Sequence, residues 1–227
     1  MITPITLFSI PLFYYFIVLA FVLPKIPIIG KFFNIINTAV HELGHALIAL
    51  FLQGNVKRIE LFSTSAGTTQ IQNAGKLSSF LVAIAGYPFA SLFSLFTFYL
   101  YIHGYYLHLI IGLTALFAVM LLLWVRNGYG VAWILLFTLL NATLLYFNYG
   151  QSIRIAALFY VIALLTESVW SSLVILYLSI VKPKESGDAA IIQKLTHIPA
   201  FFWGVMFAAV AGGMAWKVVG IIKNIGM

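Results

Sequence analysis

Cysteine is absent from this chain of 227 residues, and charged residues make up only 7% of it. The lack of cysteine excludes disulfide bonds and thiolate metal ligands, so any metal site has to use imidazole nitrogen or oxygen atoms. The scarcity of charge excludes an ordinary soluble domain, in which about a quarter of the residues are charged. Acidic residues are the scarcest, with five Asp and Glu against twelve Lys and Arg. Each carboxylate therefore needs its own explanation.

Hydrophobic residues, in contrast, make up 63% of the chain and form long runs. A helix needs about 20 apolar residues to cross the hydrocarbon core of a membrane. By that measure the sequence predicts six or seven transmembrane helices. They are expected at 4–24, 32–53, 78–101, 106–125, 131–149, 153–181 and 200–222. These segments occupy almost the whole length, so we expect one integral-membrane domain over residues 1–227. The first segment lacks a basic start and a cleavage signal and is expected to be retained.

Two segments interrupt the helical pattern. Residues 56–73 alternate in short runs around Ser65-Ala66-Gly67, which predicts two strands joined by a turn. Residues 182–199 are more polar, and Ser186 is expected to cap a short helix that ends before Pro199. The predicted fold is an all-α, multi-pass membrane protein with a small β-hairpin-like insertion.

The positive charge of the chain fits a membrane environment. With seven spans, the loops on the side of the N-terminus carry seven Lys or Arg and the other side carries five. The positive-inside rule then places the N-terminus in the cytoplasm, in a cytoplasmic membrane of bacterial type. Because the basic residues are spread over loops that meet phospholipid headgroups, the expected partner is the lipid bilayer and not nucleic acid.

The sequence His41-Glu42-Leu43-Gly44-His45 lies inside the second apolar segment. Side chains four residues apart share one face of a helix, so both imidazoles can reach one metal ion. Glu42 lies beside them, where a carboxylate can take the proton of a metal-bound water. A pair of histidines that merely bind neighbouring hydroxyls would leave Glu42 unexplained, because ionisable groups are costly in lipid. The motif predicts a zinc hydrolase within a bilayer.

A zinc hydrolase usually has a third protein ligand. Of the four remaining acidic residues, Glu60 and Glu185 are expected to be solvated beside basic residues. Asp188 begins the short polar helix, on the membrane side where the His-bearing helix ends. Glu167 lies near the middle of an apolar span, where a carboxylate is a ligand candidate or a partner for a ligand imidazole. The residues alone leave both Asp188 and Glu167 open.

Several segments resemble the M50 family of intramembrane metallopeptidases, and most of all its M50B-like branch, which is related to the site-2 proteases. They are AVHELGHALIALFLQGNVKRIEL, SAGTTQ, AGYPFASLF, Arg126-Asn127 and SGDAAIIQKLTHIPAFFWGVMF. The resemblance implies Zn2+ as cofactor, His41 and His45 as ligands, Glu42 as the catalytic acid and base, and Asp188 as the third ligand. Gly187-Asp188-Ala189 stands where better-known site-2 proteases have Asp-Gly.

The expected function is therefore hydrolysis of peptide bonds in substrates that lie in or beside the membrane. A helical substrate has to unwind before it is cut, because its backbone is hydrogen-bonded internally. An exposed strand edge at Gly67, Thr68, Thr69 and Gln70 is a candidate to pair with the unwound segment. Two alternatives are a catalytically inactive M50-like membrane scaffold or binding protein, and a transporter. Most signs of a transporter, such as several intramembrane charges, are missing.

Overall fold

The computed structural model describes residues 6–7, 10–22, 26, 29–72, 75–147 and 150–225. The helices are α1 (Leu12–Val22), α2 (Ile29–Phe51), α3 (Lys76–Ile102), α4 (Tyr106–Leu123), α5 (Gly128–Phe147), α6 (Gly150–Val181), η2 (Pro183–Glu185), α7 (Asp188–Thr196) and α8 (Ala200–Ile225). The strands are β1 (Thr6–Leu7), β2 (Ile10–Pro11), β3 (Asn55–Leu61) and β4 (Gly67–Gln72). Helices dominate, as predicted.

Five of the described helices are long and apolar enough to cross a membrane, namely α3, α4, α5, α6 and α8. The chain is therefore an integral membrane protein. Helix α2 matches the predicted span 32–53 and has 23 residues, but the polar residues it carries keep it outside this group of five.

The first predicted span, 4–24, differs from the structure. Helix α1 begins only at Leu12 and has 11 residues, so it rises about 16 Å. It follows the short antiparallel pair of β1 and β2, which ends at Pro11. Residues 1–5, 8–9 and 23–25 of this region lie outside the described residues. The apolar run predicted one helix over the whole segment, whereas the structure places strands at residues 6–7 and 10–11 and a helix too short to cross a membrane by itself.

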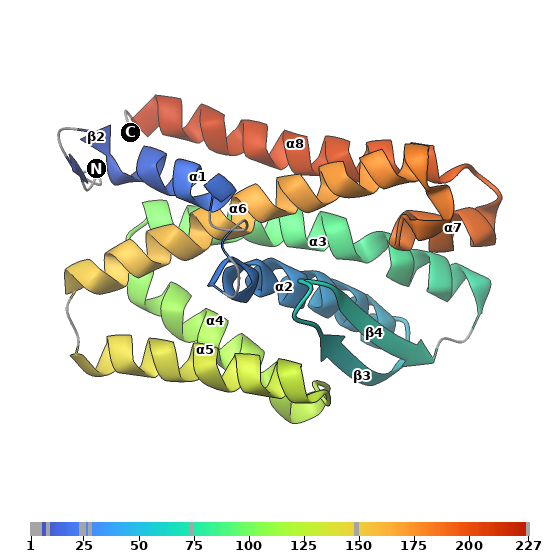
Figure 1. The fold of residues 1–227 in the computed structure, drawn as a ribbon, viewed down its shortest axis with the longest axis horizontal. Helices are drawn as coiled ribbons and strands as arrows, with labels where there is room; N and C mark the ends of the chain where they lie inside the picture. The colour runs from blue at the N-terminus through green and yellow to red at the C-terminus, as the bar shows by residue number, and fades with distance from the viewer. Residues whose placement is uncertain are drawn as a thin grey trace.

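Helix α2 lies near the centre of the molecule, with α3, α6 and α8 on one side and α4 and α5 on the other (Figure 1). It packs most extensively against α3, and it also contacts α6 and the hairpin of β3 and β4. Ile35, Ile36, Ala39 and Val40 are fully buried in this core. A Cβ on Gly44 would lie 2.7 Å from Phe89 Cβ, so the glycine allows α2 and α3 to approach closely. The HExxH segment is therefore held between packed helices.

Strands β3 and β4 form the hairpin predicted around Ser65-Ala66-Gly67. Its β3 side is attached to the segment after α4. The Ile59 amide donates to the Trp124 carbonyl at 2.9 Å. The Asn127 side chain binds both backbone groups of Leu61, accepting from its amide at 3.1 Å and donating to its carbonyl at 2.6 Å. Asn127 thus acts as a short substitute for a neighbouring strand and fixes the hairpin beside α2.

The short helix predicted in the polar segment is α7, and it packs against α3 and α8. The expectation that Ser186 caps this helix is wrong. Gly187 occupies the N-cap position with a φ of 54°, and the Ser186 hydroxyl donates instead to the Pro183 carbonyl at 2.8 Å. The positive φ suits a glycine, which has no Cβ to clash with the backbone. This sharp turn makes Asp188 the first residue of α7 and directs it toward α2.

Candidate metal centre

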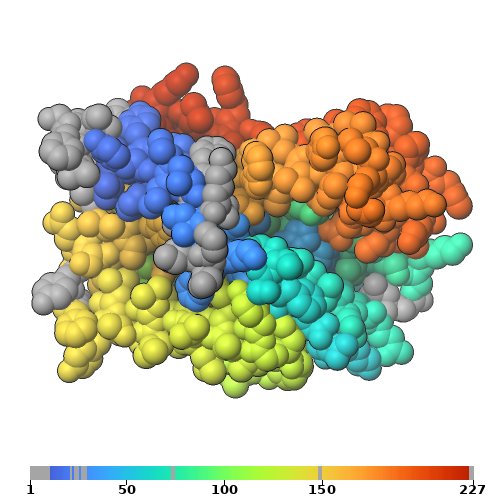
Figure 2. All heavy atoms as spheres, viewed as in Figure 1, coloured from blue at the N-terminus to red at the C-terminus, as the bar shows by residue number. Residues whose placement is uncertain are grey.

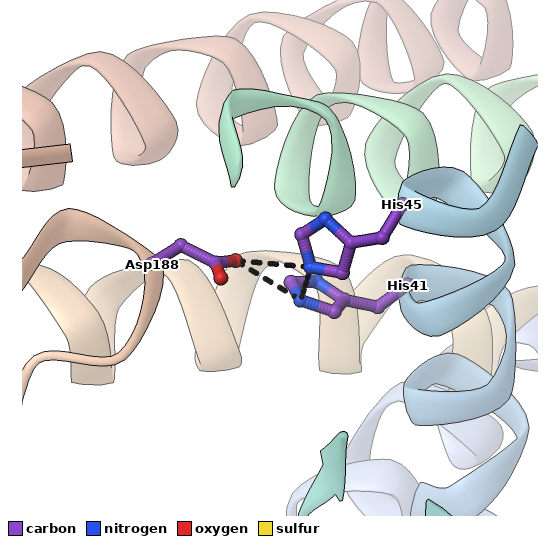
Figure 3. A group of neighbouring side chains, drawn as sticks. All are labelled: His41, His45 and Asp188. Carbon is purple, nitrogen blue, oxygen red and sulfur yellow. Dashed lines mark hydrogen bonds and ion pairs between the residues drawn. The ribbon is translucent and has the colours of Figure 1, made fainter. Parts of the chain in front are cut away.

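The two histidines of the HExxH segment lie on one face of α2, one helical turn apart, and point toward Asp188 at the start of α7 (Figure 3). The Nε2 atoms of His41 and His45 are 3.0 Å apart. Asp188 Oδ2 lies 3.2 Å from the first and 3.3 Å from the second. Three potential ligand atoms from two distant parts of the chain therefore meet at one point.

The orientation of the His45 ring is fixed by α3. Its Nδ1 lies 2.7 Å from the backbone carbonyl oxygen of Val82. A carbonyl only accepts hydrogen bonds, so Nδ1 carries the proton and the neutral ring presents the lone pair of Nε2. That lone pair faces His41 and Asp188. Metal-binding histidines commonly donate the N–H of their other ring nitrogen to a carbonyl or carboxylate, and this hydrogen bond fixes the orientation of the ring.

Gly86 of α3 provides the space that both imidazoles occupy. A Cβ at this position would lie 2.6 Å from His41 Nε2 and 2.7 Å from His45 Cε1, well inside van der Waals contact. The next residue, Tyr87, contacts the edge of the His41 ring, with ring centroids 4.4 Å apart. The segment that begins at Gly86 thus supports both histidines from behind.

The Glu42 carboxylate is held by the hairpin. The Thr69 hydroxyl donates to Glu42 Oε2 at 2.5 Å. On the other side of the carboxylate lies Gly67, the first residue of β4. A Cβ on Gly67 would lie only 2.6 Å from Glu42 Oε1, so only glycine lets the strand start this close to the acid. Glu42 is only 5% exposed. The hairpin therefore positions the one carboxylate of the motif next to the histidine pair.

The pKa of the Asp188 carboxyl is set by opposing effects of burial and of the two imidazoles. Burial by itself raises the pKa of its carboxyl, but the charge of His45 and the approach of both imidazoles, as donors when protonated, hold that pKa below its usual range. The first turn of a helix also favours a negative charge. When the imidazoles are neutral, Asp188 Oδ2 has no hydrogen-bond partner among the described residues. Three lone pairs then converge, and a cation between them relieves their repulsion.

These three atoms fit a zinc ion. Zinc binds imidazole nitrogen and carboxylate oxygen at about 2.0–2.2 Å in a tetrahedral arrangement, which places neighbouring ligand atoms about 3.3–3.6 Å apart. The observed separations of 3.0–3.3 Å are slightly shorter, as expected for ligands that can move outward by small rotations. Two imidazoles and one carboxylate leave a fourth position for water or substrate.

Two cavities meet at this centre. One, of about 240 Å³, lies between α2, α6 and the tip of the hairpin. The other, of about 450 Å³, lies between β4, α3 and α7. Both are lined by Glu42, Gly67, Gly187 and Asp188. Figure 2 shows the surface hollowed between the hairpin and the orange part of the chain, which contains α7. The centre therefore adjoins two cavities, one on the α6 side and one on the α3 and α7 side.

The other acidic residues have separate positions. Glu60 pairs with Arg58 at 3.7 Å, and Glu185 pairs with Lys182 at 3.1 Å. Glu167 lines the smaller cavity together with Asp188 but does not belong to the group that can share a metal ion, which among the described residues consists of His41, His45 and Asp188. The geometry therefore places Asp188, and not Glu167, within reach of the ion that His41 and His45 could share.

Sequence reasoning missed Val82 and Gly86 as supporting residues, and it named Thr69 only as a strand-edge candidate and not as a partner of Glu42. Val82 contributes only a backbone atom, so no side-chain pattern points to it. Gly86 lies in AGYPFASLF, where the sequence shows only a glycine next to Tyr87 and Pro88. Thr69 lies in SAGTTQ, where nothing in the sequence connects its hydroxyl to Glu42. Only the packing of α3 and the hairpin against α2 reveals what they do.

Comparison with known families identifies a match over most of the chain. The family described as Peptidase M50B-like matches residues 12–218, which is most of the chain and includes every residue of the centre. Neither a curated protein nor a solved structure matches the chain significantly.

Proposed function

Because the chain belongs to the Peptidase M50B-like family, we propose that it is an intramembrane zinc metalloprotease that cuts substrates in or beside the membrane. The observation that carries the proposal is the meeting of His41, His45 and Asp188, with Glu42 beside them and open cavities on two sides. This arrangement contains each part that zinc-dependent peptide hydrolysis needs.

His41, His45 and Asp188 are the proposed zinc ligands. Zinc, when bound there, supplies the Lewis acidity that lowers the pKa of a water molecule to about 7 and polarises the scissile carbonyl. The Val82 carbonyl keeps His45 in the tautomer that presents Nε2. Asp188 brings one negative charge, which reduces the net charge of the loaded site in a membrane protein.

Glu42 is the proposed general base and acid. Its carboxylate accepts a proton from the attacking water and then returns that proton to the nitrogen of the leaving amine. Thr69 holds Oε2 by its hydroxyl, so the carboxylate cannot rotate freely and presents one face to the reacting atoms. Burial of Glu42 excludes bulk water from this proton transfer.

The free edge of β4 is the proposed place at which an unwound substrate pairs. Ile59 and Leu61 of β3 direct their backbone groups away from β4, toward Trp124 and Asn127. In β4, Thr69 lies opposite Ile59 and Gly67 lies opposite Leu61. Opposite residues of an antiparallel pair share one hydrogen-bonding pattern, so the backbone groups of Thr69 and Gly67 point away from β3. Both line the larger cavity. Of the four expected edge residues, Gly67 and Thr69 offer backbone groups to the substrate, whereas Thr68 and Gln70 use theirs to bind β3.

Amide exchange tests the edge. When an unwound substrate peptide binds to the Glu42→Gln variant, the amides of Gly67 and Thr69 should exchange more slowly, because they gain hydrogen-bond partners. The amides of Thr68 and Gln70 should change little, and they serve as internal controls. Equal protection of all four, or none of any, would contradict pairing at this edge.

Metal removal tests the proposed activity. Purified protein in detergent, supplied with zinc, should cut a single-span test substrate, and a chelator should stop the cutting. Re-addition of zinc should restore it, because the ligands remain in place. Cutting that persists after zinc has been removed, as measured by metal analysis of the same sample, would contradict a zinc-dependent protease.

A further inference from the structure

The smaller cavity contains polar groups that the proposed reaction does not use. It is bounded by one face of α2, with Asn37 and His41, and by one face of α6, with Glu167 and Ser171. In each pair the residues are four positions apart and lie above each other on the helix. His41, Glu42 and Asp188 line the same cavity as Asn37 and Glu167, so a side chain next to a group bound at the metal centre can enter the space that Asn37 and Glu167 face.

Glu167 and Asn37 both offer acceptors without partners. Glu167 lies near the middle of α6, where a carboxylate costs free energy unless it binds something. The Glu167 side chain makes no hydrogen bond or ion pair within the described part of the chain, whose ion pairs involve Asp188, Glu60 and Glu185 instead. Asn37 is 4% exposed, and its Oδ1 has no hydrogen-bond partner among the same residues. Among the residues that the structure describes, no Lys or Arg lines this cavity.

The larger cavity on the other side of the centre has a different character. Ile71, Val82, Ala83 and Ile191 give it an apolar lining. Its polar side chains outside the centre are the uncharged hydroxyls of Thr68, Thr69 and Ser79. A peptide that passes the centre therefore meets an apolar site on one side and an acceptor-rich site on the other. Such an asymmetry discriminates between the side chains that flank a scissile bond.

We propose that Glu167 and Asn37 form a subsite that selects a basic side chain, Lys or Arg, next to the scissile bond, while the larger cavity takes an apolar one. A basic side chain supplies several donors and a positive charge, so it can bind both the carboxylate and the amide oxygen. The subsite rests on the proposed function, because the scissile bond has to lie at the metal centre. Glu167 is here a specificity residue and not a zinc ligand.

Peptide hydroxamates test the subsite without any cleavage, because the hydroxamate group binds zinc directly. Two series are needed, with the variable side chain placed before or after the hydroxamate, and each compares lysine with norleucine, which keeps most of the side-chain length but lacks the amine. On the zinc-loaded protein, the lysine compound of one series should bind about 10- to 100-fold more tightly than its norleucine partner, the range of a charge-assisted hydrogen bond.

Glu167→Gln should reduce this ratio to about 3 or less and leave the zinc content unchanged. Glu167→Lys should reverse the preference toward a hydroxamate that carries glutamate. Two controls should keep the wild-type ratio. Glu185→Gln removes a carboxylate that is paired on the surface, and Thr166→Val changes the neighbouring residue, whose hydroxyl binds its own helix at Ile162.

The outcomes separate the two proposals. If lysine and norleucine compounds bind equally well in both series, the subsite is overturned while the zinc centre stands. If Glu167→Gln loses zinc, Glu167 belongs to the metal centre and the subsite is also overturned. If no hydroxamate binds to the wild-type protein even after zinc is supplied, the proposed function fails together with the subsite.

Discussion

Replacing Gly86 with alanine should weaken zinc binding by at least about 100-fold, although Gly86 is not a ligand. The added Cβ would lie 2.6 Å from His41 Nε2 and 2.7 Å from His45 Cε1, so both imidazoles have to leave their positions. Gly86 is buried in a helix that packs against α2, and the backbone has little room to withdraw. Loss of supporting contacts around a metal typically lowers affinity by about 10- to 100-fold, and displacement of two ligands should cost at least about 100-fold.

The matched control is Gly112→Ala in α4, where an added Cβ meets nothing within 4 Å. Both variants place alanine in a long apolar helix, which by itself is favourable for helix formation. Zinc titration of the two proteins, with elution volume and helix content measured alongside, separates displacement of the histidines from misfolding. A folded Gly86→Ala protein that binds zinc as tightly as Gly112→Ala would contradict the described centre.

Replacing Glu42 with glutamine should stop cleavage and leave zinc bound. Glutamine keeps the length and shape of the side chain, and its carbonyl can still accept from Thr69, but it cannot take a proton from water at neutral pH. General acid–base catalysis contributes about 100- to 10,000-fold, so the rate of cutting should fall by a factor in this range. The measurement is the rate at which a single-span substrate is cut in detergent, with zinc content determined on the same samples.

Glu185→Gln is the control for this change, since it removes a carboxylate that is 64% exposed and paired with Lys182. It should cut at the wild-type rate. Equal rates for wild type and Glu42→Gln would remove Glu42 from the mechanism. If the zinc-loaded wild-type protein cuts none of a range of single-span substrates, the scaffold alternative becomes the better account.

The membrane helices and the hairpin could be predicted because their signals are local. The spans that became α3, α4, α5, α6 and α8 depend on the length of an apolar run, and the hairpin depends on alternation around one turn. The four-residue spacing of His41 and His45 likewise fixes their relative position within one helix. These parts of the fold and the site need no knowledge of the rest of the chain.

Local signals failed where another part of the chain decides the outcome. Ser186 is an exception, because there the decision is local: it has the chemistry of an N-cap, but the adjacent Gly187 takes that position with a positive φ. The choice between Asp188 and Glu167 depends on how α6 and α7 pack against α2, and each residue alone is a reasonable ligand. The roles of Gly86 and Val82 depend on which helix lies against the histidines. Such long-range contacts leave little trace in a single sequence.

Zinc content per purified chain tests the central claim most directly. Wild-type protein supplied with zinc should contain about one ion per chain, because one site with three protein ligands holds one zinc ion. The ion should be lost in His45→Ala and Asp188→Ala and kept in Glu167→Ala, since Glu167 lies in the adjoining cavity and not among the three converging atoms. A folded wild-type protein without zinc, or loss of zinc in Glu167→Ala with retention in Asp188→Ala, would contradict the account.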